Sequence, residues 1–203
     1  MYVVKTPKIL KRTYPKYVWD IPTVEKVIYL TFDDGPTPTI TDWVLDELKK
    51  YHAKATFFCI GKNVVENQVL FNRIVGEGHA VGNHTYNHLN GWENKPYTYL
   101  KNVLQCQQVF HSTLFRPPYG KLTRQQAKAI GKHYDIIMWD VLSADFDANN
   151  TVEKCYENVI KNTKKGSIIV FHDSKKAEKN LRYVLPKVLA NFAEQGYQFK
   201  SIK

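Results

Sequence analysis

Short runs rich in β-branched and aromatic residues alternate along the chain with longer stretches in which apolar residues recur every three or four positions. The short runs predict strands at residues 27–31, 56–60, 79–81, 113–115, 136–139, 167–171 and 197–201. The longer stretches predict helices at residues 41–51, 64–75, 97–110, 123–132, 151–164 and 179–195. Because parallel strands need long crossover connections, this alternation indicates a parallel sheet flanked by helices.

The expected fold is an α/β fold, a distorted (β/α) barrel of about seven parallel strands in a single domain. The strand segments are almost wholly apolar, which fits strands that are buried on both faces. An open, doubly wound sheet is the alternative architecture. Residues 1–24, with three prolines and little periodicity, are interpreted as an extended N-terminal arm lying on the domain formed by residues 25–203.

Composition and charge narrow the class of protein. A hydrophobic share of 43% with 24% charged residues is typical of a globular domain and excludes disordered, collagen-like and coiled-coil chains. The net charge of +10 suggests a polyanionic partner, such as nucleic acid or an acidic cell-wall polymer. The basic residues are scattered and no nucleic-acid-binding signature is present, so we expect a solvated lysine-rich surface and no nucleic-acid partner. No apolar run reaches the roughly 18 residues of a membrane span.

The cysteines and the N-terminal sequence bear on the compartment. Three cysteines without a CxxC spacing are predicted to be free, buried thiols of a reduced compartment. Residues 1–15 lack the apolar segment and cleavage site of a signal peptide. The default expectation is a cytoplasmic monomer, with export as the alternative if a leader has been removed.

Polar clusters follow the ends of five predicted strands. Their sequences are TFDDGP at 31–36, NHTYNH at 83–88, RPPYG at 116–120, DVLSAD at 140–145 and HD at 172–173. In a parallel barrel the carboxyl ends of the strands converge on one rim, where active sites form. We therefore expect these clusters to face a common space.

His84, His88 and Asp34 form a candidate metal site. The i, i+4 spacing would place both imidazoles on one side of a helical turn, although two surface histidines explain the pair alone equally well. Two imidazoles and one carboxylate are a ligand set of open catalytic zinc sites, which leave a position for water. The same ligands accept cobalt, nickel or manganese, so zinc is favoured without being fixed.

The neighbouring carboxylate, Asp33, is a candidate general base. In an extended chain the side chains of Asp33 and Asp34 point to opposite faces, so one can bind a metal while the other stays free. A cation lowers the pKa of its bound water to about 7, and Asp33 would accept the remaining proton as that water attacks a carbonyl. Asp-Gly-Pro is also a plain turn signal, which does not conflict with this role.

Two further clusters suggest catalytic partners. The Tyr119 amide is the first backbone donor after two prolines and would suit an oxyanion, whereas the simpler interpretation is a structural turn with Arg116 on the surface. His172 directly follows an apolar strand and is either a core residue or a general acid. Asp145 could hold its imidazole and raise its pKa.

Together these clusters resemble the polysaccharide deacetylase family, which is carbohydrate esterase family four or the chitooligosaccharide deacetylase homology domain. The resemblance covers residues 26–203 and rests on TFDDGP, HTYNH, RPPYG and IIVFHD in that order. It implies a divalent metal, usually zinc or cobalt, in a distorted barrel of about seven β/α units. The resemblance implies that Asp34, His84 and His88 bind the metal, and that Asp33, paired with Arg116, is the base. It implies that the Tyr119 amide is the oxyanion donor and that His172, oriented by Asp145, is the acid. The implied substrate contacts are Pro117, Trp139, Phe146 and Val170.

One motif departs from the family pattern Asp-x-x-Asp-Trp. Asp145 keeps the second aspartate, but Leu142 and Phe146 stand where the first aspartate and the tryptophan are common. Val170 also stands where leucine is usual. These differences change residues of the expected pocket wall and leave the expected metal ligands unchanged.

The expected function is metal-dependent removal of acetyl groups from an N-acetylated glycan, a peptidoglycan- or chitin-type N-acetylglucosamine polymer or oligomer. Metal-activated water would attack the acetamide carbonyl, and the bond cleaved is an amide but not a peptide bond. Alternatives are an O-acetyl esterase on a xylan-like glycan, an amidase on a small molecule, and a non-catalytic glycan-binding module of the same fold. Tyr86, Trp92 and Tyr97 would either stack on sugars or pack loops.

Overall fold

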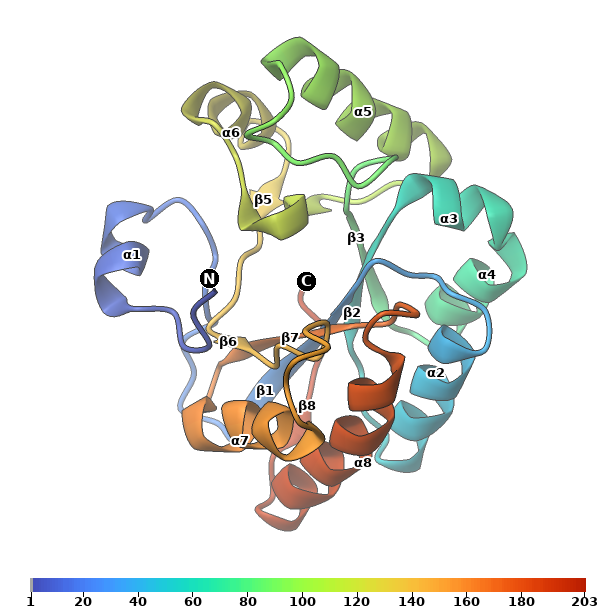
Figure 1. Cartoon of the computed structure of the whole chain (residues 1–203), viewed down its shortest axis with the longest axis vertical. Helices are drawn as coiled ribbons and strands as arrows, with labels where there is room; N and C mark the ends of the chain where they lie inside the picture. Colours follow the sequence, from blue (N-terminus) through green and yellow to red (C-terminus); the bar gives the residue numbers. More distant parts are fainter. Residues whose placement is uncertain (1) are drawn as a thin grey trace.

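A parallel sheet curled into a half-barrel forms the centre of the computed structural model, which describes residues 2–203 (Figure 1). The strands follow the order β5-β4-β3-β2-β1-β7-β6, and β8 pairs with the start of β1. This confirms the predicted distorted barrel. The strands are β1 (Val27–Asp33), β2 (Thr56–Cys59), β3 (Ala80–Asn83), β4 (Leu114–Phe115), β5 (Asp135–Ile136), β6 (Val141–Leu142), β7 (Ile168–His172) and β8 (Gln198–Phe199).

Helices surround the outer face of the sheet (Figure 1). Capping boxes at Thr39 and Thr123 help to fix where two of them begin. Within residues 2–203, no helix combines the length and the apolar character needed to cross a membrane. The helices are α1 (Lys8–Thr13), α2 (Ile40–Lys50), α3 (Gly61–Glu66), α4 (Gln68–Gly76), α5 (Pro96–Val109), α6 (Arg124–Ile130), α7 (Val152–Asn162) and α8 (Glu178–Glu194), with a 3₁₀ turn at Pro118–Gly120.

Three local predictions were wrong. The helix expected at 64–75 is two helices, α3 and α4, because Asn67 between them leaves the helical conformation with φ −134° and ψ 49°. The arm expected to be extended contains the short helix α1. Strand β6 lies inside the cluster that was read as a polar loop, since two residues are too few to show a strand period.

The N-terminal arm crosses between the two ends of the sheet path, β5 and β6. The backbone of Val4 accepts a hydrogen bond from β6, and the backbone of Val18 exchanges hydrogen bonds with β5 and the residues after it. Asp140, which is fully buried at the start of β6, holds the arm through the ammonium groups of Lys5 and Lys11, each at 2.6 Å. Asp140 thus has a structural role, although it belongs to one of the five polar clusters.

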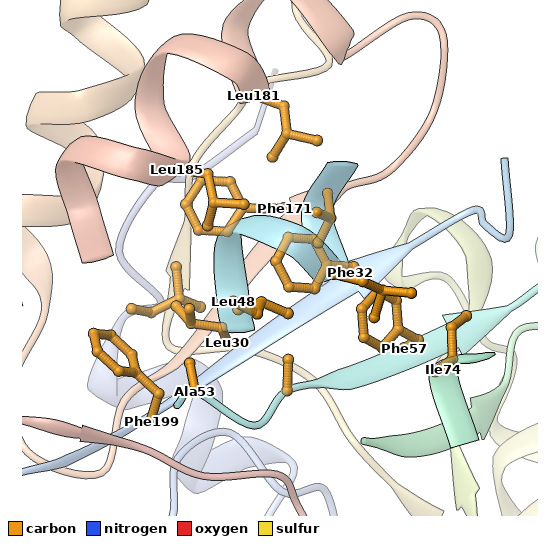
Figure 2. Packing of buried hydrophobic residues seen from close by; sticks show 14 of the residues in the cluster. Leu30, Phe32, Leu48, Ala53, Phe57, Ile74, Phe171, Leu181, Leu185 and Phe199 are labelled. Atoms are coloured by element: carbon orange, nitrogen blue, oxygen red, sulfur yellow. The ribbon is translucent and has the colours of Figure 1, made fainter. Parts of the chain in front are cut away.

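Successive side chains of β1 point to opposite faces of the sheet and lie in different environments. Phe32 points outward into the main core, where its ring stacks on Phe57 at 5.0 Å and on Phe171 at 5.9 Å (Figure 2). Each such buried ring contributes about 1.5–3 kcal/mol through burial. Thr31 and Asp33 point the other way, toward a buried arginine inside the half-barrel. The outer core therefore fixes the strands whose inward side chains form the site.

Candidate active site

A pocket of about 610 Å³ opens beside the carboxyl ends of the strands. All five polar clusters contribute to its lining, so the predicted convergence is observed. Arg116 and Asp145 are fully buried and hydrogen-bonded to the lining residues Asp33 and His172. The predicted site residues that line the pocket are Asp33, Asp34, His84, His88, Pro117, Tyr119, Trp139, Phe146, Val170 and His172.

The end of β1 separates the two adjacent carboxylates. Asp33 is the last residue of the strand, and its Oδ1 lies 2.7 Å from Nη1 of Arg116. Asp34 has a left-handed backbone with φ 83°, and its carboxylate lies beside His84 and His88. The two side chains diverge because the strand ends in a turn, whereas the prediction assumed an extended segment.

Asp173 holds this turn from behind. Its Oδ1 accepts a hydrogen bond from the Gly35 N–H at 3.0 Å, and its Oδ2 accepts one from the Thr41 hydroxyl. A Cβ on Gly35 would lie 2.0 Å from Oδ2 of Asp173, so only glycine fits here. Burial raises the pKa of Asp173 to about 7. Asp173 was not among the predicted site residues, although its position next to His172 in a polar cluster was a usable signal.

Three potential ligand atoms lie within 4.8 Å of one another, one each from Asp34, His84 and His88. Oδ1 of Asp34 is 3.2 Å from Nε2 of His88 and 3.7 Å from Nε2 of His84. This oxygen is buried, yet it has no hydrogen-bond partner of acceptable geometry within residues 2–203. An orphaned buried carboxylate oxygen facing two imidazole nitrogens fits a divalent cation that prefers nitrogen and oxygen ligands.

His84 is held in the protonation state that binds metals. Its Nδ1 lies 2.8 Å from the carbonyl oxygen of Arg116, and because a carbonyl only accepts, Nδ1 carries the proton and Nε2 is free. Burial lowers the pKa of His84 to about 4, which keeps the ring neutral. The helical turn predicted for this segment was wrong, since residues 84–88 form a loop in which Thr85 and His88 have positive φ.

Arg116 lies inside the half-barrel, so the alternative of a surface arginine was wrong. Its Nη1 donates to both Asp33 and Thr31 at 2.7 Å. Its Nε and Nη2 donate to the carbonyl oxygens of Ile137 and Met138 at 3.1 and 2.8 Å. The guanidinium thereby fixes one carboxylate oxygen of Asp33 and satisfies the backbone that follows β5.

The Tyr119 backbone carries a free donor. Tyr119 has φ 60°, inside a 3₁₀ turn that directly follows Pro117. Its N–H donates no hydrogen bond within residues 2–203, and the residue lines the pocket. The Tyr119 ring packs on His88, with 4.7 Å between ring centroids. An unpartnered amide beside the ligand cluster is a geometry that suits an oxyanion.

His172, which lines the pocket, forms a pair with the fully buried Asp145. Oδ1 of Asp145 lies 2.8 Å from Nδ1 of His172, and Oδ2 accepts the His172 backbone N–H at 2.9 Å. Burial lowers the pKa of His172, but the charge and the hydrogen bond of Asp145 outweigh it and raise this pKa to about 9. Asn180 of α8 donates to the Asp145 carbonyl oxygen and helps to fix the pair.

The His172–Asp145 pair predicts how the reaction rate depends on pH. If His172 acts as an acid, activity needs its protonated form and falls as the pH rises through its pKa. Replacing Asp145 by asparagine removes the charge that raises this pKa, so the alkaline limb of the kcat/KM profile should move to lower pH by about 1–3 units. The measurement is a pH–rate profile with an NMR titration of the imidazole. An alkaline limb at the wild-type position would contradict the pairing.

Some lining residues were not predicted from the sequence. Tyr2 packs edge-on against Phe146 at 5.4 Å and donates a hydrogen bond to Asp147 at 2.7 Å. No local signal could place Tyr2 there, because 143 residues separate it from Phe146. The other additional lining residues are Gly120, Lys121, Ser174, Lys175 and Lys176, whereas Leu142 lies in the pocket wall as expected.

The three aromatic residues considered for sugar stacking do not line this pocket. Tyr86 packs against the main core cluster instead. Trp92 and Tyr97 are largely exposed, and the Trp92 Nε1–H donates to the Leu122 carbonyl oxygen. The apolar wall of the pocket comes from Trp139, Leu142, Phe146 and Val170, which pack together.

A half-barrel whose strand ends surround a pocket with carboxylate and imidazole side chains in its lining places the protein among α/β-barrel enzymes. The sequence model described as polysaccharide deacetylase matches residues 20–135. The chain belongs to the polysaccharide deacetylase family.

Its relatives agree with this assignment. A peptidoglycan-N-acetylglucosamine deacetylase of Bacillus cereus is 37% identical, with 91% of this chain and 90% of the relative covered. The peptidoglycan-N-acetylmuramic acid deacetylase PdaA of Bacillus subtilis is 32% identical, over 89% of this chain and 71% of the relative. The crystal structure of the Bc1960 peptidoglycan N-acetylglucosamine deacetylase superposes with a TM-score of 0.88 at 28% identity, covering 97% of this chain and 95% of that chain.

Proposed function

We propose that the protein hydrolyses the acetamide of an N-acetylated glycan, with N-acetylglucosamine of peptidoglycan or chitin type as the reacting sugar. The observation that carries this proposal is the meeting of three groups in one pocket: the ligand cluster, the Asp33 carboxylate and the His172–Asp145 pair. The relatives named as peptidoglycan deacetylases support the same chemistry.

Asp34, His84 and His88 are the residues that would hold a divalent cation, with zinc favoured over cobalt, nickel or manganese. When bound, such a cation supplies positive charge that polarises a carbonyl oxygen and makes water more acidic. The Nδ1–H bond of His84 to the Arg116 carbonyl oxygen keeps one ligand ring in a fixed orientation.

The nucleophile is water, and Asp33 takes its proton as the oxygen attacks the acetamide carbon. Arg116 holds Oδ1 of Asp33, which orients the carboxylate and balances its charge inside the protein. The Tyr119 N–H donates to the carbonyl oxygen as negative charge builds on it. One such donor typically contributes about 3 kcal/mol of transition-state stabilisation.

The second half of the reaction breaks the carbon–nitrogen bond. His172 donates a proton to the departing nitrogen, so the products are acetate and a glucosamine amine. Asp145 keeps the imidazole oriented and protonated. The acetyl methyl lies against Trp139, Leu142 and Val170, which form the apolar wall.

The proposal is tested by acetate release from N-acetylglucosamine oligomers and from peptidoglycan, with O-acetylated xylan as a comparison. We expect release from the N-acetylated glycans that falls after chelation and returns when zinc is added. Elemental analysis of the purified protein should show one bound metal ion per chain. No acetate from either N-acetylated glycan with metal restored, or release from the O-acetyl ester alone, would overturn the proposal.

A further inference from the structure

Three lysines line the pocket, namely Lys121, Lys175 and Lys176. Within residues 2–203 none of them forms an ion pair with a carboxylate. The reaction proposed above uses none of these ammonium groups. They are therefore available to a ligand that occupies the pocket.

The three lysines enter the pocket lining from two different strand ends. Lys121 follows the 3₁₀ turn after β4, whereas Lys175 and Lys176 follow β7. In the sheet, β4 and β7 are separated by β3, β2 and β1. A glycan strand whose reacting sugar lies over the ligand cluster would thus meet positive charge in both directions.

Aromatic rings support two of these lysines. The Lys121 ammonium lies 5.1 Å from the centre of the Trp92 ring, and the Lys176 ammonium lies 5.6 Å from the centre of the Phe146 ring. Phe146 also packs edge-on against His172 at 5.0 Å. Such contacts limit how freely a lysine moves while its charge stays accessible to a ligand.

The nearby carboxylates are already engaged. Asp33 is paired with Arg116, and Asp34 belongs to the ligand cluster. Asp147 lies close enough to sense the charge of Lys176, but its oxygens accept hydrogen bonds from Tyr2 and from the backbone of Asn149. Asp147 keeps its charge and offsets part of that of Lys176, but three ammonium groups beside this one carboxylate leave the pocket rim with an excess of positive charge.

From this geometry we propose that Lys121, Lys175 and Lys176 form an anion-binding subsite for carboxylates on the sugars that flank the reacting N-acetyl sugar. The inference rests on the proposed function and deepens it. It selects an acidic glycan, in which neighbouring sugars carry carboxylates, over a neutral chitin-type polymer that offers no group for these lysines. Electrostatic complementarity of this kind acts on binding and association more than on the chemical step.

The test compares two versions of one substrate. Peptide-free glycan strands of alternating N-acetylglucosamine and N-acetylmuramic acid carry free carboxylates, and converting these groups to amides gives a neutral strand of the same length. The K121Q/K175Q/K176Q variant is compared with K101Q/K132Q/K154Q, which removes the same charge from exposed lysines outside the pocket. Acetate release gives kcat and KM, and binding to the Asp33→Asn variant is measured separately.

We expect the pocket variant to raise KM for the acidic strand about tenfold, because each exposed ion pair is weak but three act together. Its kcat, and its KM for the amidated strand, should stay within about twofold of wild type, and the control variant should behave like wild type. Added salt should weaken the binding of the acidic strand to the Asp33→Asn variant and leave the binding of the amidated strand unchanged.

Equal affinity of the Asp33→Asn variant, with its three lysines intact, for the two strands, or equal losses in both triple variants, would overturn the subsite. Because binding is measured on Asp33→Asn, it decides the question even if no acetate is released from any glycan. Preferential binding of the acidic strand without turnover would retain the subsite and reject the proposed reaction. Acetate release without preferential binding of the acidic strand would reject the subsite and retain the proposed reaction.

Discussion

Replacing Asp33 by asparagine should lower acetate release by about 10²–10⁴-fold, the usual contribution of a general base. Asparagine has nearly the same shape, and its side-chain oxygen can still accept a hydrogen bond from Arg116. It cannot take a proton from water at neutral pH. Asp33 is also outside the ligand cluster, so the metal content should stay at the wild-type level.

The loss should appear in kcat, because the carboxylate acts on the attacking water and not on the resting substrate. Asp135→Asn is the matched control, since Asp135 is exposed on β5 and outside the pocket. Thermal unfolding and elemental analysis establish that the variant is folded and loaded. A turnover within about threefold of wild type would show that another group is the base.

The sequence predicted the parts of the molecule that depend on local patterns. Apolar runs such as residues 168–171 indicated buried parallel strands. The polar clusters directly after these runs predicted that Asp33 and His172 lie at one rim of the sheet. Both inferences use only neighbouring residues and the geometry of parallel sheets. The His172–Asp145 contact was also anticipated, because both residues belong to polar clusters at strand ends that were expected to face one rim.

The remaining features depend on contacts between distant segments. The pairing of Arg116 with Asp33 was expected only from the family resemblance, because buried arginines are rare and the RPPYG segment alone suggests a surface residue. Its burial depends on acceptors from β1 and from the residues that follow β5. Tyr2 reaches the pocket only because the arm crosses the open side of the half-barrel. His84 and His88 have helical spacing but lie in a loop, because Thr85 and His88 have positive φ. A pattern of apolar residues does not reveal such backbone angles.

Replacing Arg116 by methionine should lower the free energy of unfolding by about 3–5 kcal/mol. The methionine side chain can keep apolar contact with Phe58, whose ring centre lies 4.1 Å from the guanidinium. It cannot pair with the buried carboxylate of Asp33 or donate to the carbonyl oxygens of Ile137 and Met138. Urea unfolding measures the loss, with Arg182→Met as control, because the exposed pair of Arg182 and Glu178 is worth less than about 1 kcal/mol.

A double variant shows how much of the lost unfolding free energy comes from leaving a buried charge unpaired and how much from losing the other contacts of Arg116. In Asp33→Asn/Arg116→Met no unpaired charge stays inside the half-barrel, so the double variant should be more stable than the sum of the single changes by about 1–3 kcal/mol. The carbonyl oxygens beyond β5 remain unsatisfied, so wild-type stability should not return. Strictly additive losses would mean that Arg116 stabilises the fold through its backbone contacts alone. A positive coupling would show that the arginine is retained inside the protein to hold a charged Asp33 at the pocket.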